Sequence, residues 1–243
     1  PLNSKINYLV FPNPRFAFLK VLELFSEADK KNEKNQIAPT AIIHPTAKIG
    51  SECSIGHYVI IEEGCSVGNN THIGHNTVLL KKTKVGSHVT IGCNNTIGGV
   101  GFGYEKDEDG KNILLPHIGN VIIHDFVEIG NNTCIDRAVL GSTVISDYVK
   151  IDNLVHIAHG VFIGKNSLVI ANAMIGGSAK IGENCWVAPS ASVINKGEIG
   201  NGATVAMGAV VVKAVQSNQT VAGSPAQPTE VLKIINSFLK KQS

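Results

Sequence analysis

The sequence predicts an all-β fold, a parallel β-helix of eight to nine coils in which short strands alternate with corners. The main observation is a repeat of six residues: isoleucine, valine or leucine occupies 26 positions at this spacing, from Ile37 to Val211. A second observation is that glycine follows many of these positions, as in Ile49-Gly50. A period of six suits neither an α-helix nor an alternating strand, but three such repeats make one triangular coil.

The repeat also predicts how side chains stack along the solenoid. Residues 18 positions apart should lie on neighbouring coils, about 4.8 Å from each other, in a prism on the order of 40 Å long. The aliphatic residue of each repeat points inward, and the next residue sits at a corner. We expect glycine there because it adopts backbone angles that other residues avoid.

Two interruptions of the repeat predict loops that leave the prism. The longer one, from Gly98 to Ile122, contains Asp109-Gly110 and a cluster of glycines, which are typical of an extended hairpin. The shorter one is a slip of four residues around Leu140–Thr143. Because loops on a rigid scaffold often carry functional residues, we expect part of a site here.

Short helices are expected at both ends of the chain. Asn13 can cap a first helix, with Pro14 at its first helical position. A charged linker is expected at residues 29–35. Thr229 is expected to cap a second helix, whose apolar side is formed by Val231, Leu232, Ile235, Phe238 and Leu239.

These features divide the sequence into three parts. Residues 1–35 form an N-terminal segment with a helix, residues 36–212 form the β-helix with the loop 98–122, and residues 213–243 form a C-terminal extension with a helix.

Composition narrows the classes of function. The net charge is +2 and there is no basic stripe with interleaved aromatic residues, so nucleic acid is not expected as a partner. Five scattered cysteines without CxxC spacing indicate a reducing compartment, and no apolar run approaches the length of a membrane span. With only 16% charged residues and many β-branched ones, one prism face is expected to be buried against copies of the chain, in a closed homotrimer.

The stretch Ile151–Gly164, IDNLVHIAHGVFIG, stands out because a repeat built for packing has no need of histidines at its corners. His156 and His159 lie three residues apart in it. An imidazole can accept a proton near neutral pH, as a general base must, although a corner histidine can also simply bond a neighbouring carbonyl. A metal pair is not favoured, since this spacing splays the two rings apart and no third ligand is evident.

Four motifs carry a resemblance to a known family: PNPRFAFLKVLELF at Pro12–Phe25, GVGFGY, the run LPHIGNVIIHDFVEIGNNTCIDRAVL, and KIDNLVHIAHGVFIG. With them the chain resembles the bacterial UDP-3-O-acylglucosamine N-acyltransferases of lipid A biosynthesis, most closely over Pro12–Phe25 and Gly98–Gly177. These are hexapeptide-repeat acyltransferases with a left-handed parallel β-helix. Such enzymes normally carry a uridine-binding domain ahead of the first helix, so with eleven residues before Pro12 we expect the nucleotide pocket to be absent or reduced here.

The resemblance implies an acyl transfer in the bacterial cytoplasm. The amine of a nucleotide-linked amino sugar attacks a thioester on acyl carrier protein, in clefts between the subunits of a trimer, and no metal takes part. Two alternatives remain open. The chain can be a coenzyme A-dependent N-acetyl- or N-acyltransferase acting on a dTDP- or UDP-aminodeoxy sugar of a surface polysaccharide, or a β-helix scaffold without catalytic activity.

The resemblance also implies roles for the central motif. His159 is the expected general base, and Gly177, 18 residues further on, is expected one coil above it with its backbone N–H free to hold the oxyanion. Asp152 is expected to orient the imidazole or bind the amine, with the capping of a corner as the alternative. Asn153 and His156 are placed near the substrate, although for His156 plain solvation is the simpler interpretation.

Further residues are candidates for binding the substrate. In the longer loop, Phe102, Tyr104 and His117 either wall the acyl or sugar pocket or only stabilise the hairpin.

Two polar pairs are also candidates. Asp136 and Arg137 occupy the IDR motif, and Arg137 is expected to fix a structural ion pair across subunits, with a phosphate contact as the alternative. Asn195 and Lys196 occupy a run where the family carries a second active-site histidine, and we expect them to contact phosphate instead.

Overall fold

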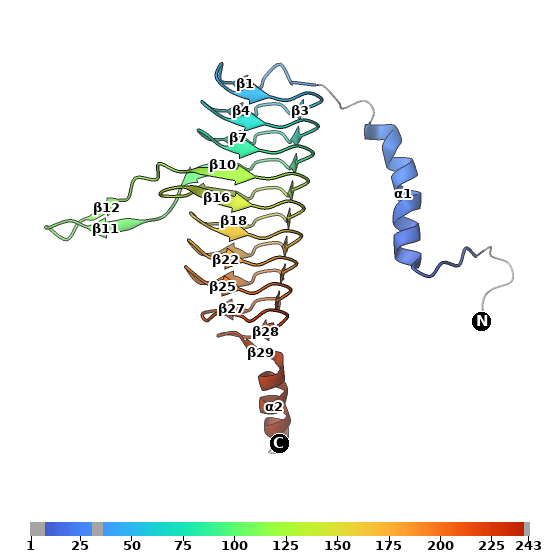
Figure 1. Cartoon of the computed structure of the whole chain (residues 1–243), viewed down its shortest axis with the longest axis vertical. Coiled ribbons are helices and arrows are strands. Elements are labelled where there is room, and N and C mark those ends of the chain that lie inside the picture. Colours follow the sequence, from blue (N-terminus) through green and yellow to red (C-terminus); the bar gives the residue numbers. More distant parts are fainter. Residues whose placement is uncertain (1–7, 31–35, 241–243) are drawn as a thin grey trace. The chain divides into compact units, whose positions relative to one another are not determined.

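A computed structural model describes residues 8–30 and 36–240 of the chain. The chain divides into two compact units, Pro1–Asn35 and Gln36–Ser243. The first unit contains helix α1 (Pro14–Lys30) and the second contains the stack of coils, which ends in helix α2 (Thr229–Lys240) (Figure 1). No described helix is long and apolar enough to cross a bilayer.

Helix α1 begins as the sequence predicts. The backbone N–H of Phe16 donates to Asn13 Oδ1 over 3.0 Å, which satisfies one of the free donors of the first turn, and Pro14 stands at the first position. The helix continues to Lys30, so the start of the charged linker expected at residues 29–35 is helical. The rest of that linker lies outside the described residues.

The coils form three parallel sheets, each running the length of the prism. Sheet I contains β1 (Ile42–Ile43), β4 (Ile60–Ile61), β7 (Val78–Leu79), β10 (Thr96–Val100), β15 (Cys134–Arg137), β18 (His156–Ile157), β21 (Met174–Ile175), β24 (Ser192–Val193) and β27 (Val210–Val211). Sheet II contains β2 (Lys48–Ile49), β5 (Ser66–Val67), β8 (Lys84–Val85), β13 (Asn120–Ile123), β16 (Ser142–Ile145), β19 (Phe162–Ile163), β22 (Lys180–Ile181) and β25 (Glu198–Ile199). Sheet III contains β3 (Ser54–Ile55), β6 (His72–Ile73), β9 (Thr90–Ile91), β14 (Glu128–Ile129), β17 (Lys150–Ile151), β20 (Leu168–Val169), β23 (Trp186–Val187), β26 (Thr204–Val205), β28 (Thr220–Ala222) and β29 (Gln227–Pro228).

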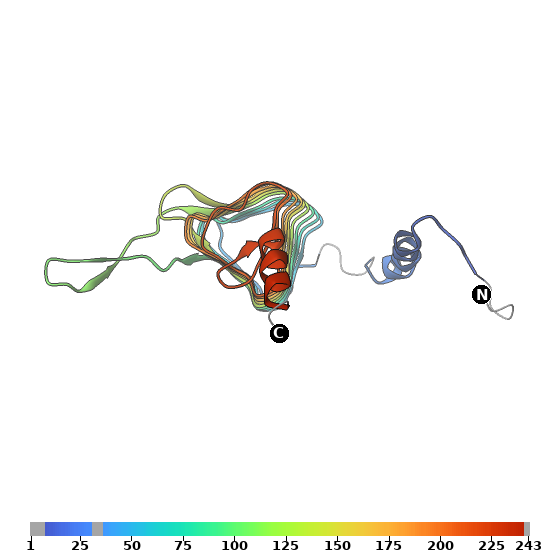
Figure 2. The ribbon, with the colours of Figure 1, turned by 90° about the horizontal axis from the view of Figure 1, so that it is seen from below.

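The predicted β-helix of eight to nine coils is confirmed, because sheet I has nine strands, sheet II has eight, and sheet III has ten, of which β29 alone runs antiparallel. Viewed along its axis, the prism is triangular (Figure 2). Regular coils pair residues 18 apart, as in Ile157 with Ile175. At the two interruptions the pairing spans more residues, as in Ile97 with Ile135 and Ile135 with Ile157, yet the inward face is kept.

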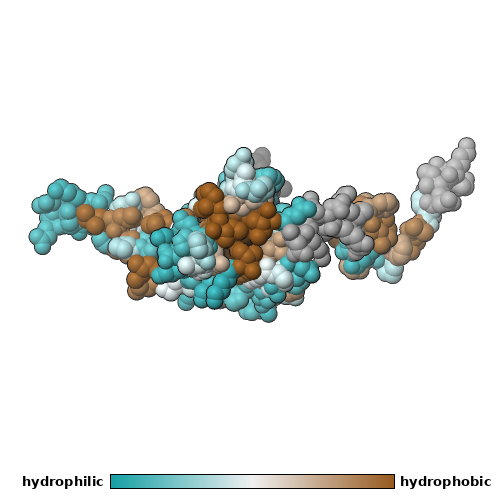
Figure 3. All heavy atoms as spheres, turned by 90° about the horizontal axis from the view of Figure 1, so that it is seen from above, coloured by the Kyte–Doolittle hydropathy of each residue, from teal (hydrophilic) through white to brown (hydrophobic). Residues whose placement is uncertain are grey.

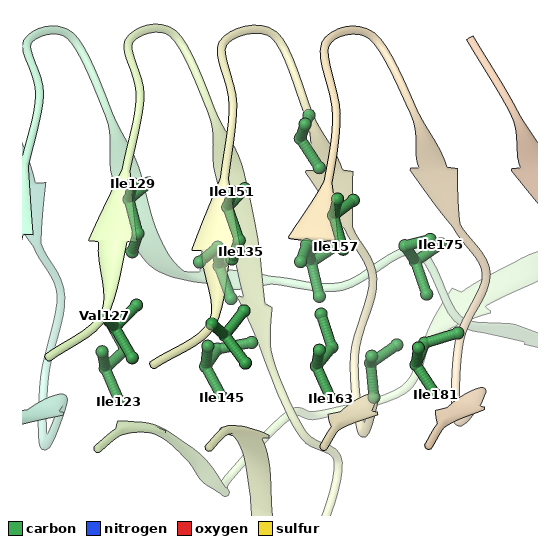
Figure 4. Close-up of a cluster of buried hydrophobic side chains, with 14 of the residues drawn as sticks. Ile123, Val127, Ile129, Ile135, Ile145, Ile151, Ile157, Ile163, Ile175 and Ile181 are labelled. Atoms are coloured by element: carbon green, nitrogen blue, oxygen red, sulfur yellow. The ribbon is translucent and has the colours of Figure 1, made fainter. Parts of the chain in front are cut away.

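The core is the column of aliphatic residues that the repeat predicts. Ile135, Ile145, Ile157 and Ile163 have no solvent-exposed surface, and Figure 4 shows such side chains stacked along the interior from one coil to the next. Each fully buried aliphatic side chain contributes roughly 1.5–3 kcal/mol relative to an exposed one, so the column stabilises the stack.

The glycine that follows many of the aliphatic residues has a different cause from the one that the sequence suggested. Gly164, for example, does not have a positive φ angle, but a Cβ added to it would lie 2.6 Å from the backbone of Gly182 on the next coil. The left-handed position is instead the third residue after the aliphatic one, as at Leu154 (φ 61°), Gly160 (φ 70°) and Asn172 (φ 61°). Close approach of stacked corners, rather than backbone freedom, therefore selects the glycine.

Polar side chains satisfy backbone N–H groups at the corners. Asn69 Oδ1 accepts from the N–H of Ser51, and Asn153 Oδ1 accepts from that of Asn131, over 2.9 and 2.6 Å. The five cysteines are free thiols, in agreement with their scattered spacing. At the far end, β28 pairs with β29 and α2 packs against both.

Candidate functional site

Both interruptions of the repeat leave the prism at the same corner, between sheets I and II. After β10, the chain makes a hairpin of β11 (Tyr104–Lys106) and β12 (Asn112–Leu114) that projects from the prism and then returns to β13 (Figures 1 and 2). After β15, the shorter excursion leads into β16. His159 follows β18 at the same corner, which we call the I–II corner. The two loops and this histidine therefore converge on one corner.

The shorter excursion is fastened to the turn beside His159. Thr143 is fully buried, and its hydroxyl donates to the carbonyl of Asp136 over 2.7 Å. The same hydroxyl accepts from the N–H of Gly160 over 2.8 Å. One side chain thus links β15 to the residue that follows His159.

The His159 imidazole is enclosed by two glycines. A Cβ added to Gly177 would lie 2.7 Å from His159 Nε2, and one added to Gly101 would lie 2.8 Å from His159 Cβ. Gly177 stands one coil above His159, as the 18-residue spacing predicts, because the neighbouring Ser178 N–H donates to the His159 carbonyl over 2.8 Å. Any larger residue at either position would displace the ring.

The prediction that the Gly177 N–H is free to hold an oxyanion is wrong. This N–H donates to Asn195 Oδ1 over 2.9 Å, so it is not free to hold an oxyanion. The reason is the corner-capping pattern described above, in which an amide oxygen of the next coil takes the N–H. Asn195 is therefore part of that pattern, while Lys196 after it is exposed, with its own N–H donating to the Gly177 carbonyl.

His117 contacts His159, which the sequence did not reveal. It lies on the chain that returns from the hairpin and is only 6% exposed. Its Nδ1 lies 2.7 Å from the carbonyl oxygen of Leu115, and its ring meets that of His159 edge-on, with centroids 5.1 Å apart and planes at 76°. Its Nε2 is the one buried side-chain nitrogen or oxygen without a hydrogen-bond partner among the described residues.

Asp136 is the carboxylate that faces the histidines. Its side chain is 13% exposed, and its Oδ2 lies 3.7 Å from His156 Nε2. Burial raises the pKa of Asp136, while His156, His159 and His117 act in the opposite direction. Burial, followed by the charge of His117, lowers the pKa of His159, and Asp136 opposes this.

Arg137 makes a contact within the chain that was not expected. Its Nε donates to the Gly98 carbonyl over 2.6 Å, which fixes the root of the hairpin excursion. Among the described residues it forms no ion pair with Asp136, and the expected pairing across subunits stays a prediction.

Asp152 is not brought to His159. Its Oδ1 accepts from the backbone and side-chain N–H groups of Asn153 over 2.7 and 2.8 Å, and its Oδ2 accepts from the N–H of Ala171 over 3.2 Å. It therefore caps the corner between sheets III and I, the alternative considered from the sequence. Seven residues are little more than one repeat, so Asp152 falls at the corner before that of His159. With Asn153 it lines a shallow depression on sheet III instead.

Phe102 and Tyr104 lie on the hairpin, with ring centroids 5.0 Å apart. Phe102 is 85% exposed, so it walls no closed pocket within one chain. Figure 3 shows that the tip of the hairpin is hydrophilic and that hydrophobic residues lie nearer the prism. The described residues include no group of three or more histidine, cysteine, aspartate or glutamate side chains placed to hold a metal ion.

The fold and the histidine-lined corner define a class, the hexapeptide-repeat proteins with a left-handed parallel β-helix. A solved UDP-N-acetylglucosamine acyltransferase from Campylobacter jejuni has the same fold, with a TM-score of 0.71 and 22% identity over 79% of this chain and 73% of that one. The family model of the GMPPB C-terminal domain matches residues 37–101.

Sequence relatives narrow the class to a family. UDP-3-O-acylglucosamine N-acyltransferase 2 of Legionella pneumophila (strain Paris) is 52% identical over 235 residues, covering 90% of this chain and 68% of that protein. UDP-3-O-acylglucosamine N-acyltransferase 1 of Francisella tularensis subsp. holarctica (strain OSU18) is 41% identical over 186 residues, covering 69% of this chain. The chain belongs to the UDP-3-O-acylglucosamine N-acyltransferase family. It spans about half the length of the Francisella relative, 53%.

Proposed function

We propose that this protein transfers an acyl group from the thioester of acyl carrier protein to the amine of UDP-3-O-acylglucosamine, in lipid A biosynthesis, with His159 as the general base. The family membership supports the reaction. The observation that carries the role of His159 is its place at the I–II corner, where the absence of side chains at Gly177 and Gly101 leaves room for the ring.

The proposed reaction has one nucleophilic step. The amine nitrogen attacks the thioester carbonyl carbon, a C–N bond forms and the C–S bond breaks. His159 accepts a proton from the nitrogen as it attacks and delivers a proton to the departing sulfur, so the products are an amide and a free thiol. A neutral imidazole is required at the start, and the lowered pKa of His159 favours that form near neutral pH.

Asp136 would stabilise the charge that develops in this step. When His159 accepts the proton it becomes a cation in a half-buried site. Asp136 is a nearby carboxylate and opposes the lowering of the His159 pKa, as a negative charge close to the ring does. His156, paired with Asp136 at 3.7 Å, holds that carboxylate in place.

The rest of the substrate would be held by a trimer. The His159 ring lies on an outer corner of the prism, and Phe102, Tyr104 and other apolar residues of the hairpin are exposed beside it. A second copy packed against this corner would complete the cleft and bury them. Lys196 and Arg137 are two cations of this corner that would meet phosphate groups. We place the reaction in the bacterial cytoplasm, where acyl carrier protein and nucleotide sugars are found together.

The test is an assay of the purified protein with four substrate combinations. Acyl carrier protein and coenzyme A thioesters are each offered with UDP-3-O-acylglucosamine and with a dTDP-aminodeoxy sugar, and amide formation is followed by mass spectrometry. We expect turnover with the carrier protein and the UDP sugar, and a loss of about 10²- to 10⁴-fold in His159→Ala. Turnover only with coenzyme A and the aminodeoxy sugar would replace the proposed substrates, and near-normal turnover in His159→Ala would remove the proposed base.

A further inference from the structure

The starting point is the unpartnered nitrogen of His117. A buried polar atom without a hydrogen bond costs about 1–3 kcal/mol, so such atoms are rare and call for an explanation. His117 Nε2 is the one case among the described side chains, and it lies in the proposed active site, against His159.

The other nitrogen of His117 determines what Nε2 can do. Nδ1 lies 2.7 Å from the Leu115 carbonyl oxygen, which can only accept, so Nδ1 must carry the hydrogen. In the neutral imidazole Nε2 is then a bare lone pair, and it needs a donor. Within the part of the chain that the structure describes, His159 is the one ring in contact with that of His117, and the two ring centroids lie 5.1 Å apart. His159 is therefore the candidate donor.

The distance between the two rings fits a direct hydrogen bond. An imidazole nitrogen lies about 1.2 Å from its ring centre, so a linear N–H···N bond of about 2.9 Å places two ring centres roughly 5 Å apart. The edge of the His159 ring that lies toward His117 carries the carbon Cδ2. Both this carbon and His117 Nε2 lie beside Gly101, because a Cβ added to that glycine would be 2.9 Å from the first and 2.8 Å from the second.

A half-turn of the His159 ring brings a donor to that edge. The turn exchanges Cδ2 with Nδ1 and Cε1 with Nε2, two orientations of nearly the same shape. The base nitrogen keeps its place against Gly177, because the Cβ position there is 2.7 Å from Nε2 and 2.8 Å from Cε1. Only the first exchange changes the bonding, since it sets Nδ1–H opposite the lone pair of His117.

We infer that His117 is the positioning residue of the base: His159 Nδ1–H donates to His117 Nε2, and His117 Nδ1–H donates to the Leu115 carbonyl. This chain of bonds fixes the His159 tautomer with its Nε2 bare, as proton abstraction from an amine requires. The catalytic reading of this pair rests on the proposed function, whereas the hydrogen bond itself does not. His117 thereby orients the imidazole of His159, the role that the sequence suggested for Asp152.

The first test reads the tautomer directly and needs no substrate. The full-length protein is labelled with ¹⁵N-histidine, and the His159 signals are assigned by their loss in His159→Ala. At a pH where His159 is neutral, we expect hydrogen on Nδ1 in the wild type. In His117→Leu, which keeps an apolar side chain in place of the ring, we expect hydrogen on Nε2, the form that free histidine favours. Hydrogen on Nε2 in the wild type, or an unchanged tautomer in His117→Leu, overturns the inference.

The second test uses kinetics and a conservative variant. His117→Leu should lower kcat by about 100-fold with KM nearly unchanged, because it removes the group that orients the base rather than one that binds substrate. His117→Gln keeps an acceptor oxygen and should recover much of that loss. Because Asp136 and His117 both act on the pKa of His159 and His156 in turn lies beside Asp136, each variant is measured across a pH series rather than at one pH.

The outcomes separate the two proposals. A wild type without acyl transfer removes the proposed function, and the tautomer measurement still decides on the hydrogen bond. An active wild type with His117→Leu at wild-type kcat overturns the role of His117 alone. Equal losses in His117→Leu and His117→Gln also overturn it, because a lost acceptor would then not be the cause. If His117→Leu does not fold, the wild-type tautomer and His117→Gln decide.

Discussion

At the scale of the residue, the strength of His159 as a base is set by its neighbours. Burial and His117 favour the neutral ring, and Asp136 favours the charged one, with the first two stronger because the pKa is lowered. A base works in its neutral form, so a lowered pKa keeps it active at more acidic pH than an ordinary histidine, whose pKa is about 6.5.

Removing the carboxylate should move the pH profile in a known direction. In Asp136→Asn the group that raises the His159 pKa is gone, so the acid limb of kcat/KM shifts to lower pH, while kcat falls because the imidazolium loses its counter-charge. Asp152→Asn, at another corner, is the matched control and should leave the limb unmoved. A limb that moves to higher pH in Asp136→Asn would contradict this account of the electrostatics.

Gly177 tests the packing around the base. In Gly177→Ala the new methyl would fall 2.7 Å from His159 Nε2, so the ring must shift. We expect a loss of about 100-fold in kcat with little change in the melting temperature, since a misplacement of about 1 Å can cost that much. Gly103→Ala is the control, because its nearest neighbour would lie at 3.4 Å, an ordinary contact. Equal losses of kcat in Gly177→Ala and Gly103→Ala would point to a general defect of the I–II corner rather than to a displaced ring.

Some of the site could be predicted from the sequence, and some could not. Gly177 was placed above His159 because 18 residues separate them along regular coils. His117 was not placed beside His159, because the chain between them leaves the prism and returns. How far an excursion reaches before it folds back depends on contacts such as that of Thr143, which carry no periodic signal.

At the scale of the element, the corners show where a repeat tolerates irregular residues. Three rings occupy left-handed positions on successive coils at the corner between sheets II and III, where large side chains are unusual: His88, Phe126 and Tyr148. They stack face to face, with centroids 4.8 Å apart in each pair and interplanar angles of 4° and 0°. The coil spacing matches a stacking distance, so the contact offsets the backbone cost.

Leu154 has no such compensation. It is 58% exposed with a φ angle of 61°, at a corner where the preceding coil has Asn132 in the same conformation. Leu154→Asn should therefore raise the free energy of unfolding by roughly 0.5–1 kcal/mol, because asparagine accepts this conformation more readily. The reciprocal variant Asn132→Leu should lower it by a similar amount, as measured by denaturant titration. A destabilised Leu154→Asn would show that the leucine makes a contact in the assembled protein.

The elements themselves followed from the period of six, since the aliphatic positions from Ile55 to Val211 became short strands with a buried residue. The reason for the glycines was misjudged, because a sequence does not say how closely two corners approach. Gly164 shows this, since its constraint comes from Gly182 on another coil.

At the scale of the whole molecule, the prediction concerns assembly. The exposed apolar residues of the hairpin and the corner should be covered by copies of the chain, so light scattering should give three times the 25.7 kDa of one chain. A hairpin variant, Ile113→Lys with Leu114→Lys, should weaken the trimer. Lysines at two adjacent exposed residues of the last coil, Gln216 and Ser217, serve as the control. A monomer in the wild type would contradict the proposed cleft between subunits.

The hairpin enters and leaves at one corner, and the sheets resume their register on both sides of it. Its length and sequence are therefore decoupled from the stability of the stack, which loses no strand when the detour changes. The hairpin can therefore be lengthened, shortened or replaced while the coils keep their structure. Replacing residues 104–114 by the corresponding hairpin of a relative should then leave the melting temperature of the recipient unchanged.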